Sequence, residues 1–189
     1  MTTTPAPHET IIFSQEDIER TLKRLTHELL EANQGSKNLV IVGIQTRGKF
    51  IAQRIAQYIE TFEQNKVPVG ILDINLYRDD LSTVSHAPVV NSTDIPFSVV
   101  GKDIILMDDV LYTGRTIRAA LDALFDQGRA ARVQLLVLID RGHRELPISA
   151  RYVGRMVQTT ANEIIEVKFQ EIDGMEKVLL VERIAEQNA

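Results

Sequence analysis

Apolar positions recur at helix-like and strand-like spacing in alternation along this chain. From Ile18 to Leu29 they come every three or four residues, which predicts a helix with one apolar face. Ser14 and Asp17 precede this stretch in an acidic variant of the capping box, so we expect the helix to begin after Ser14 and to end at Gly35. The apolar face of this helix needs a core to pack against.

Short apolar runs alternate with two further helical segments over the next hundred residues. Helical spacing is found in Phe50–Phe62 and from about Thr116 to Phe125, and the predicted strands are Leu39–Val42, Val67–Leu76, Ile104–Met107 and Val133–Ile139. Strands that alternate with helices in this way form parallel, doubly wound sheets. The sequence therefore predicts an α/β fold with a central, mostly parallel sheet flanked by helices.

Two segments depart from this alternation. Tyr77–Phe97 is mostly polar and contains two prolines, and a loop of that length in a compact domain is usually functional or disordered. After Arg151 the pattern becomes β-rich, with apolar runs at Ile164–Phe169 and Val178–Val181. The Asp173-Gly174 turn between these runs predicts that they pair as a hairpin.

Composition sets the class of protein. With 189 residues, 44% of them hydrophobic, the chain suits one globular domain, and the absence of cysteine excludes disulfides and thiol chemistry. Residues 1–10 lack the apolar core of a signal peptide, and the longest apolar run, Leu135–Ile139, is too short to cross a bilayer. We therefore expect a cytoplasmic protein without a membrane partner. The net charge of −5 argues against general nucleic-acid binding but leaves room for a local basic patch.

One stretch, Ile104–Thr116, carries the most specific chemistry. An apolar strand is followed by Asp108 and Asp109, then by a turn containing Thr113 and Gly114, then by a helix. Free backbone N–H groups and the helix dipole at such a turn bind anions. Adjacent carboxylates would repel a bare phosphate, so their presence favours a ligand that also carries hydroxyl groups or a metal ion. A ribose 5-phosphate with a free diol and a bound Mg²⁺ has all of these parts.

A second loop, Gly43–Gly48, also follows a strand and precedes a helix. Parallel strands place such loops at the same carboxyl edge of the sheet, where ligands bind. Alone the motif is weak, because a tight strand-to-helix turn also explains its glycines. Two anion-binding loops at one edge nevertheless suit a ligand with phosphates at both ends.

The stretch Ile104–Thr116 resembles the phosphoribosyl diphosphate (PRPP) signature of the type I phosphoribosyltransferases. The resemblance implies that fold, with a small β-rich hood and a flexible loop that closes over the reacting centre. It implies that Thr113–Thr116 binds the 5-phosphate, that Thr46-Arg47-Gly48 binds the pyrophosphate, and that Mg²⁺ arrives with PRPP without a direct protein ligand. The implied catalytic residues are Asp108, Asp109 and Arg78, and the implied PRPP or nucleotide contacts are Thr46, Arg47, Gly48, Asp108, Asp109, Val110, Leu111, Tyr112, Thr113, Gly114, Arg115 and Thr116.

Three stretches resemble one branch of that family more closely, namely Leu76–Leu81, Asp109–Thr116 and Ile139–Pro147. Members of this branch regulate bacterial pyrimidine operons and are also uracil phosphoribosyltransferases. The resemblance implies transfer from PRPP to uracil, giving UMP and pyrophosphate, with Arg141 and the backbone near Val157 contacting uracil. It also implies a homodimer or homotetramer. On this basis we expect a single domain over 1–189, an ordered core over 10–183, a flexible loop at 77–97 and a hood mainly from 141–183.

The same branch binds the leader mRNA of the pyrimidine operon when UMP or UTP is present. On the first predicted helix the basic residues fall within about a third of the helical wheel, opposite the apolar face. The expected RNA contacts are Arg20, Lys23, Arg24, His27, Arg144 and Arg155. Because the helix also carries Glu19, Glu28 and Glu31, a solvated helix of mixed charge is the simpler interpretation of that face.

Four functions remain open at this point. The first is the dual enzyme and regulator, the second is a uracil salvage enzyme without RNA binding, and the third is a regulator with vestigial catalysis. The fourth is a phosphoribosyltransferase for another base, such as adenine or hypoxanthine. Members specific for 6-oxopurines have an acid immediately before Thr-Gly, where this chain has Tyr112, and that difference argues against the hypoxanthine form.

Overall fold

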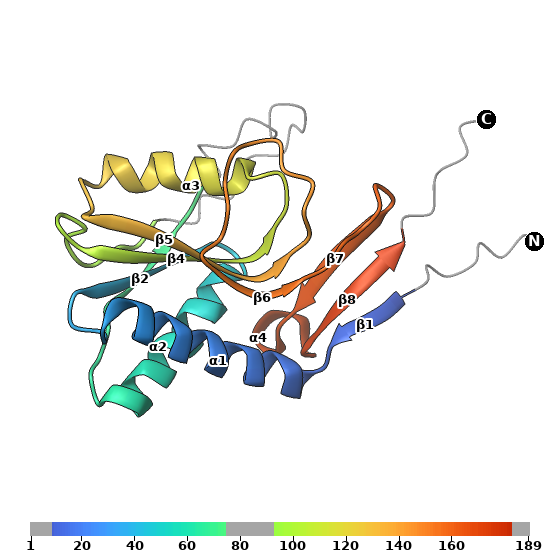
Figure 1. Cartoon of the computed structure of the whole chain (residues 1–189), viewed down its shortest axis with the longest axis horizontal. Coiled ribbons are helices and arrows are strands. Elements are labelled where there is room, and N and C mark those ends of the chain that lie inside the picture. Colours follow the sequence, from blue (N-terminus) through green and yellow to red (C-terminus); the bar gives the residue numbers. More distant parts are fainter. Residues whose placement is uncertain (1–8, 75–92, 183–189) are drawn as a thin grey trace, which may run out of the picture.

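Five parallel strands form the centre of the protein in the computed structural model, which describes residues 9–74 and 93–182 (Figure 1). In spatial order the strands are β3 (Val69–Leu72), β2 (Leu39–Ile44), β4 (Asp103–Leu111), β5 (Arg132–Asp140) and β6 (Tyr152–Met156). All six residues of β2 are buried, as are the last seven of β5, because both strands have helices on their faces. The predicted mostly parallel sheet is confirmed.

Helices cover both faces of this sheet. In Figure 1 α1 (Gln15–Asn33) and α2 (Gly48–Glu63) lie below the sheet and α3 (Arg115–Asp126) lies above it. The predicted capping box opens α1, since the Ser14 N–H donates to Asp17 Oδ2 at 3.0 Å and the Asp17 N–H donates to Ser14 Oγ at 3.2 Å. The chain leaves the helix through Gln34 and Gly35, both with positive φ.

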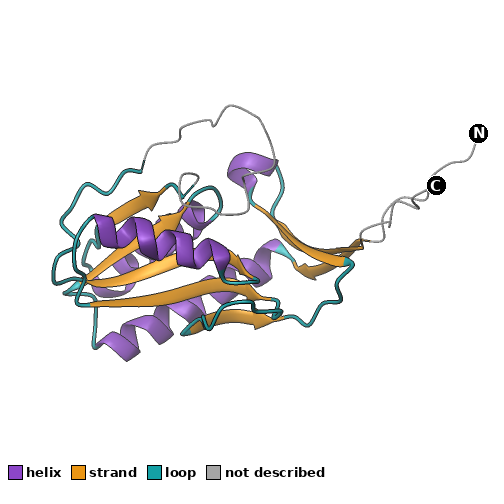
Figure 2. Cartoon of the chain, turned by 90° about the horizontal axis from the view of Figure 1, so that it is seen from above, coloured by secondary structure: helices purple, strands orange, loops and turns teal. Residues whose placement is uncertain are grey.

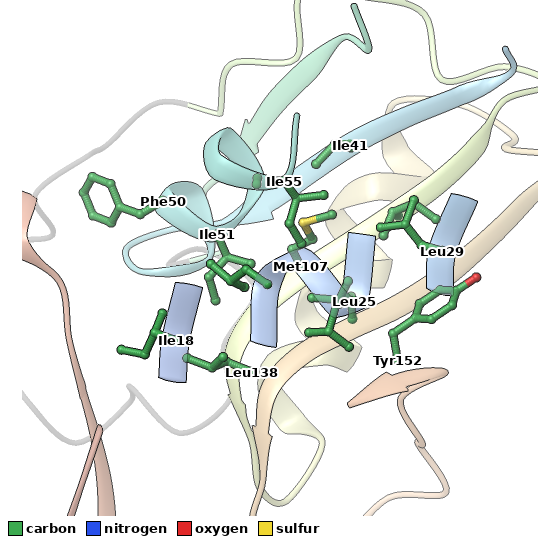
Figure 3. Packing of buried hydrophobic residues seen from close by; sticks show 14 of the residues in the cluster. Ile18, Leu25, Leu29, Ile41, Phe50, Ile51, Ile55, Met107, Leu138 and Tyr152 are labelled. Carbon is green, nitrogen blue, oxygen red and sulfur yellow. The ribbon is translucent and has the colours of Figure 1, made fainter. Parts of the chain in front are cut away.

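The larger core lies between the sheet and the pair α1–α2. Ile18, Leu25 and Leu29 of α1 are fully buried and face Ile51 and Ile55 of α2 (Figure 3). A second core fills the space between the sheet and α3. Each fully buried aliphatic side chain contributes about 1.5–3 kcal/mol to the free energy of folding. The apolar positions that recur at helical spacing in the sequence are the ones that make this contribution in α1 and α2.

A smaller antiparallel sheet stands beside the main one and contains β1 (Glu9–Phe13), β8 (Lys177–Glu182) and β7 (Glu163–Lys168) in that order (Figure 2). The predicted hairpin is β7 with β8, joined by the short helix α4 (Gln170–Asp173) and by Gly174 at φ +66°. The sequence prediction omits β1. It also assigns the β-rich region after Arg151 to no sheet in particular, whereas β6 pairs with β5 as the outer strand of the parallel sheet.

The order in which strands are added to the sheet changes direction between the parallel neighbours β2 and β4. From β2 it runs through α2 on one face to β3, and from β4 it runs through α3 on the other face to β5. The loops that leave these two neighbouring strands therefore diverge and open a crevice at the carboxyl edge of the sheet. Ligands of doubly wound proteins bind at such switch points.

Two boundaries differ from the prediction. Strand β4 continues through the acidic pair to Leu111, which pairs with Asp140, so the carboxylates lie inside the strand rather than after it. Strand β3 begins at Val69, after Pro68, and ends at Leu72. Of the predicted loop 77–97 only 93–97 is described, where Asp94 forms a bridge with Ile71. Arg78 lies outside the described residues.

Candidate functional site

The signature loop, residues 112–114, joins β4 to α3 at the carboxyl edge of the sheet. Gly114 has a φ of +95° directly before Arg115, the first helical residue, and an L side chain would be strained in that conformation. Residues 110–117 line a hollow of about 110 Å³. Because the first turn of α3 forms part of its wall, unpaired N–H groups and the helix dipole favour an anion there. The hollow lies where the sequence predicts a 5-phosphate.

A second loop follows β5 and fastens the signature loop in place. Two of its backbone N–H groups donate to the carbonyl oxygen of Thr113, at 2.9 and 3.1 Å. The Arg144 guanidinium donates to the carbonyl oxygens of Tyr112 and Ile148, at 2.8 and 2.9 Å, and pairs with Asp140. These contacts show that the partly exposed Arg144 side chain supports the signature loop, and its expected contact with RNA stays a prediction.

The acidic pair lies one strand away from the second glycine-bounded loop. Asp108 is 6% exposed, and Asp109 is partly exposed. Asp108 Oδ1 accepts the N–H of Asp109 at 2.9 Å, and Asp109 Oδ1 accepts the N–H of Val110 at 3.0 Å. A hollow of about 290 Å³ is lined by Gln45, Thr46, Arg47, Asp108, Asp109, Val110 and Thr116. The structure thus brings the acidic pair and both loops to one place.

The second acid, Asp109, lies where its negative charge is unfavourable. Burial raises the pKa of the Asp109 carboxyl, against the hydrogen bond with Asp108 and the positive charge of Arg47, which both lower it. The protein therefore keeps a carboxylate where its ionisation costs free energy. Such an arrangement is typical of functional sites, because a structural side chain would be neutral or fully paired.

Close backbone contact places the loop of residues 45–47 against the acids. The Gln45–Thr46 peptide is cis. Gly48 follows at the start of α2, and a Cβ on it would lie 2.3 Å from the Met107 carbonyl oxygen and 3.2 Å from Asp108 Cα. Only glycine therefore allows the N-terminus of α2 to approach β4 this closely. Glycine is therefore required at position 48 by packing. This packing sets the distance between the loop of residues 45–47 and the acidic pair.

Arg47 connects this loop to the small sheet. Its Nη2 lies 3.1 Å from Asp173 Oδ1, at the end of α4. Together with Asp109 and the β7 residues Ile165–Lys168, Arg47 also lines a second hollow of about 290 Å³. The sequence prediction misses both Asp173 and Lys168. It identifies Asp173-Gly174 only as a turn, and no local signal links that turn to a loop 126 residues earlier.

Arg141, expected to contact uracil, is 7% exposed and firmly held. Its Nε donates to Thr159 Oγ1 at 3.2 Å, its Nη2 donates to the Glu163 carbonyl oxygen at 2.8 Å, and its guanidinium carbon lies 4.0 Å from the centre of the Tyr112 ring. His143 Nε2 lies 2.6 Å from the Thr159 carbonyl oxygen. Thr159 therefore fixes two basic side chains beside the half-exposed Tyr112, a role that the sequence does not reveal.

Val157, the other expected uracil contact, directly follows β6. Its N–H donates to the Asp140 carbonyl oxygen at 2.8 Å, which extends the β5–β6 pairing by one residue. Because Arg141 directly follows Asp140, the two expected uracil contacts lie on neighbouring chain segments at the same edge of the sheet.

The expected RNA contacts on α1 are exposed, namely Arg20, Lys23, Arg24 and His27. Two of them are paired, since Lys23 lies 2.5 Å from Glu19 and Arg24 lies 2.5 Å from Glu28. Arg24 also donates to the Gly154 carbonyl oxygen at 2.7 Å. These exposed pairs reduce the net charge of the face, so an RNA backbone would have to compete with the glutamates for the cations.

Aromatic side chains of α2 lie next to this face. The His27 ring stacks on Phe62 with centroids 4.3 Å apart, and Phe62 stacks on Tyr58 at 6.2 Å. The helical wheel of α1 alone could not reveal these partners. The remaining expected contact, Arg155, lies over the Phe13 ring at 4.4 Å and donates to the Ile12 carbonyl oxygen at 2.9 Å.

Within residues 9–74 and 93–182, no three or more His, Cys, Asp or Glu side chains are grouped so that they could hold a metal ion. The helices of the same part of the chain are too short or too polar to cross a membrane.

Comparison with known proteins gives consistent matches. The model of the phosphoribosyl transferase domain family matches residues 8–172. A protein named bifunctional protein PyrR from Pelotomaculum thermopropionicum is 57% identical over 171 residues, covering 90% of this chain and 94% of that protein. The PyrR protein of Thermus aquaticus is 54% identical over 172 residues, covering 91% and 95%. A hypoxanthine phosphoribosyltransferase structure from Staphylococcus aureus has a TM-score of 0.67 at 19% identity, covering 94% of this chain and 93% of the other, so it shares the fold.

Proposed function

The chain belongs to the PyrR proteins of the phosphoribosyl transferase family, and from that premise we propose that it transfers the phosphoribosyl group of PRPP to uracil and regulates pyrimidine genes through leader mRNA. One observation supports the enzymatic part most. Two anion-binding loops diverge at the switch point between β2 and β4, and a pair of carboxylates lies between them. This arrangement matches a sugar that carries a 5-phosphate at one end and a pyrophosphate at the other.

The proposed reaction needs positioning and charge stabilisation rather than a covalent intermediate. The C1–O bond to pyrophosphate breaks and both electrons leave with pyrophosphate, while uracil N1 bonds to C1 and releases its proton to solvent. Asp108 and Asp109 orient the ribose hydroxyls and offset the positive charge that develops on the ring. Arg47 stabilises the departing anion, and Arg141 with the backbone near Val157 orients uracil. Arg78 is proposed as a second partner for the pyrophosphate and lies outside the described residues.

The donor atoms of the site suit Mg²⁺ carried by PRPP. Two carboxylates line the central hollow, and oxygen ligands of this kind are the ones that Mg²⁺ prefers. Bound with the pyrophosphate, the ion would neutralise part of the charge that builds up on the leaving group. Asp108 and Asp109 would hold it through the ribose hydroxyls or through water.

A panel of bases tests the enzymatic proposal. Purified protein is incubated with PRPP and Mg²⁺ and with uracil, cytosine, adenine, hypoxanthine or guanine, and nucleotide formation is measured. We expect UMP as the main product, because Tyr112 occupies the place of the acid that 6-oxopurine enzymes use. A preference for hypoxanthine would overturn the choice of base, and the absence of any PRPP-dependent product would overturn the activity.

The regulatory part depends on family membership together with the exposed basic residues of α1. Loop bases of RNA stack on aromatic rings, and the row of His27, Phe62 and Tyr58 lies beside those basic residues. The glutamate partners of Lys23 and Arg24 argue in the other direction. We also propose that the protein assembles as a homodimer or homotetramer, which light scattering would check.

A filter-binding titration with the pyrimidine-operon leader RNA tests regulation. At fixed salt we expect UMP to strengthen binding, and we expect the variant Arg20→Ala/His27→Ala to lose about thirtyfold in affinity, since each of the two phosphate or stacking contacts contributes about 1 kcal/mol. Glu9→Gln, an exposed change on β1, is the control. Binding that is indifferent to UMP and lost at moderate salt would leave a uracil salvage enzyme.

A further inference from the structure

Arg47 of the loop that precedes α2 is held by a carboxylate from α4, the short helix between β7 and β8. Its Nη2 lies 3.1 Å from Asp173 Oδ1 and 3.4 Å from Asp173 Oδ2. We propose that Asp173 is a positioning residue for phosphoribosyl transfer, which holds the Arg47 guanidinium at the pyrophosphate subsite. This inference rests on the proposed function and adds to it a residue 126 positions away along the chain.

Asp173 is itself rigidly placed. Its Oδ2 accepts the N–H of Phe169 at 2.9 Å, and its own N–H donates to the Phe169 carbonyl oxygen at 2.8 Å. Phe169 is fully buried and packs against Phe50 of α2, with ring centroids 5.9 Å apart. The carboxylate is therefore anchored to the hydrophobic core through its own short helix.

A second arginine fixes the same short helix from outside. Arg54 of α2 pairs with Glu171 at 2.9 Å and with Glu176, and its guanidinium lies over the Phe169 ring at 5.1 Å. These contacts hold α4 against α2 whether or not Arg47 is present. Asp173 and Arg47 thus form a separate link from this supported helix to the loop that precedes α2.

Arg47 lies at the site, where the contact with Asp173 can orient its guanidinium toward a ligand. Arg47 lines the hollow that contains both acids and also the hollow that extends toward β7. Among the described residues its guanidinium donates only to Asp173 and only through Nη2, and its buried Nε has no partner. A guanidinium has five N–H donors in a fixed plane, so the Nη1 end is left for a phosphate oxygen.

Holding Arg47 in advance lowers the cost of binding. A free arginine side chain loses much rotational freedom when it binds a phosphate, and a side chain that is already ordered loses less. Asp173 also competes for the same positive charge, and competition alone would weaken PRPP binding. The rigid anchoring of Asp173, together with its use of a single guanidinium nitrogen, favours positioning over competition.

Steady-state kinetics of Asp173→Ala test this role. We expect the KM for PRPP to rise about five- to tenfold, the size expected for ordering one long side chain, while the KM for uracil stays near its original value. Calorimetric titration with Mg²⁺ and PRPP should show the same loss of affinity without turnover. Glu171→Gln is the matched control. It removes a carboxylate from the same helix, but this carboxylate pairs with Arg54 and not with Arg47.

A double-mutant cycle separates positioning from a general effect on folding. In an Arg47→Ala background, Asp173→Ala should cause no further loss in kcat/KM for PRPP, because its effect passes through Arg47. Asp173→Asn keeps an acceptor for the Phe169 N–H and should fold if Asp173→Ala does not, with the KM for PRPP raised to a smaller extent.

The outcomes of these experiments distinguish a failure of the Asp173 role from a failure of the proposed function. An unchanged or lowered KM for PRPP in Asp173→Ala, with normal wild-type turnover, overturns the positioning role and leaves the proposed function intact. Additive losses in the double variant overturn the positioning role as well. If the wild-type protein neither binds nor consumes PRPP, both the proposed function and this inference are wrong.

Discussion

Replacement of both Asp108 and Asp109 by asparagine is expected to reduce uracil phosphoribosyl transfer by about 10³-fold or more, the loss typical of removing preorganised charge stabilisation. Asparagine has nearly the same shape as aspartate and can still accept the N–H groups at 2.9 and 3.0 Å. The backbone of β4 should therefore keep its course. What disappears is the negative charge that orients the ribose hydroxyls and offsets the developing oxocarbenium ion.

The same variant is expected to be more stable than the wild type at neutral pH. Burial raises the pKa of Asp109 in the folded protein, so folding favours the protonated form, and above the raised pKa the charged form costs stability. Below the ordinary carboxyl pKa both folded and unfolded chains are protonated and this cost is absent. The difference in Tm between variant and wild type should therefore be small in acid and grow as pH rises through the raised pKa.

Two measurements check this prediction, namely initial rates of UMP formation and thermal unfolding between about pH 4 and pH 8. An inactive, more stable variant fits a charged pair that serves catalysis at the cost of stability. Full activity in the double variant would refute the catalytic role of the pair. A fall in Tm at pH 7 would instead mean that the carboxylates contribute to folding.

Local sequence patterns predicted the elements that contact their chain neighbours. The helix after Ser14, the strand–loop–helix units around residues 43–48 and 112–114, and the β7–β8 hairpin all carry their signals within a few residues. The expected site loops and acids consequently come together as parallel-strand topology requires. Strand β1 escaped prediction because its partner, β8, lies about 170 residues later, and five residues with incomplete alternation do not specify such a pairing.

Contacts between distant segments also explain what was missed in the site. Thr159 contacts Arg141 and Asp173 contacts Arg47, and each pair joins the parallel sheet or its loops to the region after β6. Nothing within a few residues of a threonine or of a turn aspartate indicates which arginine it will meet. Arg144 is a further example, since a basic residue in a charged loop suggests a surface contact and gives no sign that its guanidinium also binds carbonyl oxygens of its own fold.

Gly48→Ala is expected to impair both stability and catalysis. The added Cβ would lie 2.3 Å from the Met107 carbonyl oxygen, so the start of α2 must move away from β4. Forced repacking of this kind costs about 1–3 kcal/mol. Because Thr46 and Arg47 directly precede this residue, the loop would shift relative to the acids, and a displacement of about 1 Å can cost about 10²-fold in rate. Initial rates at varied PRPP, with thermal unfolding, measure both effects.

Gly154→Ala is the matched control for Gly48→Ala. Its Cβ would lie 2.2 Å from the Leu138 carbonyl oxygen, an equally severe backbone clash, but between β6 and β5 and away from the loop of residues 45–47. We expect it to lower Tm to a similar degree while the KM for PRPP of the folded protein stays near the wild-type value. If the two variants lost PRPP affinity equally, the approach of α2 to β4 would have no special part in the site. A selective loss in Gly48→Ala would show that a single missing side chain sets the distance between the pyrophosphate loop and the carboxylates.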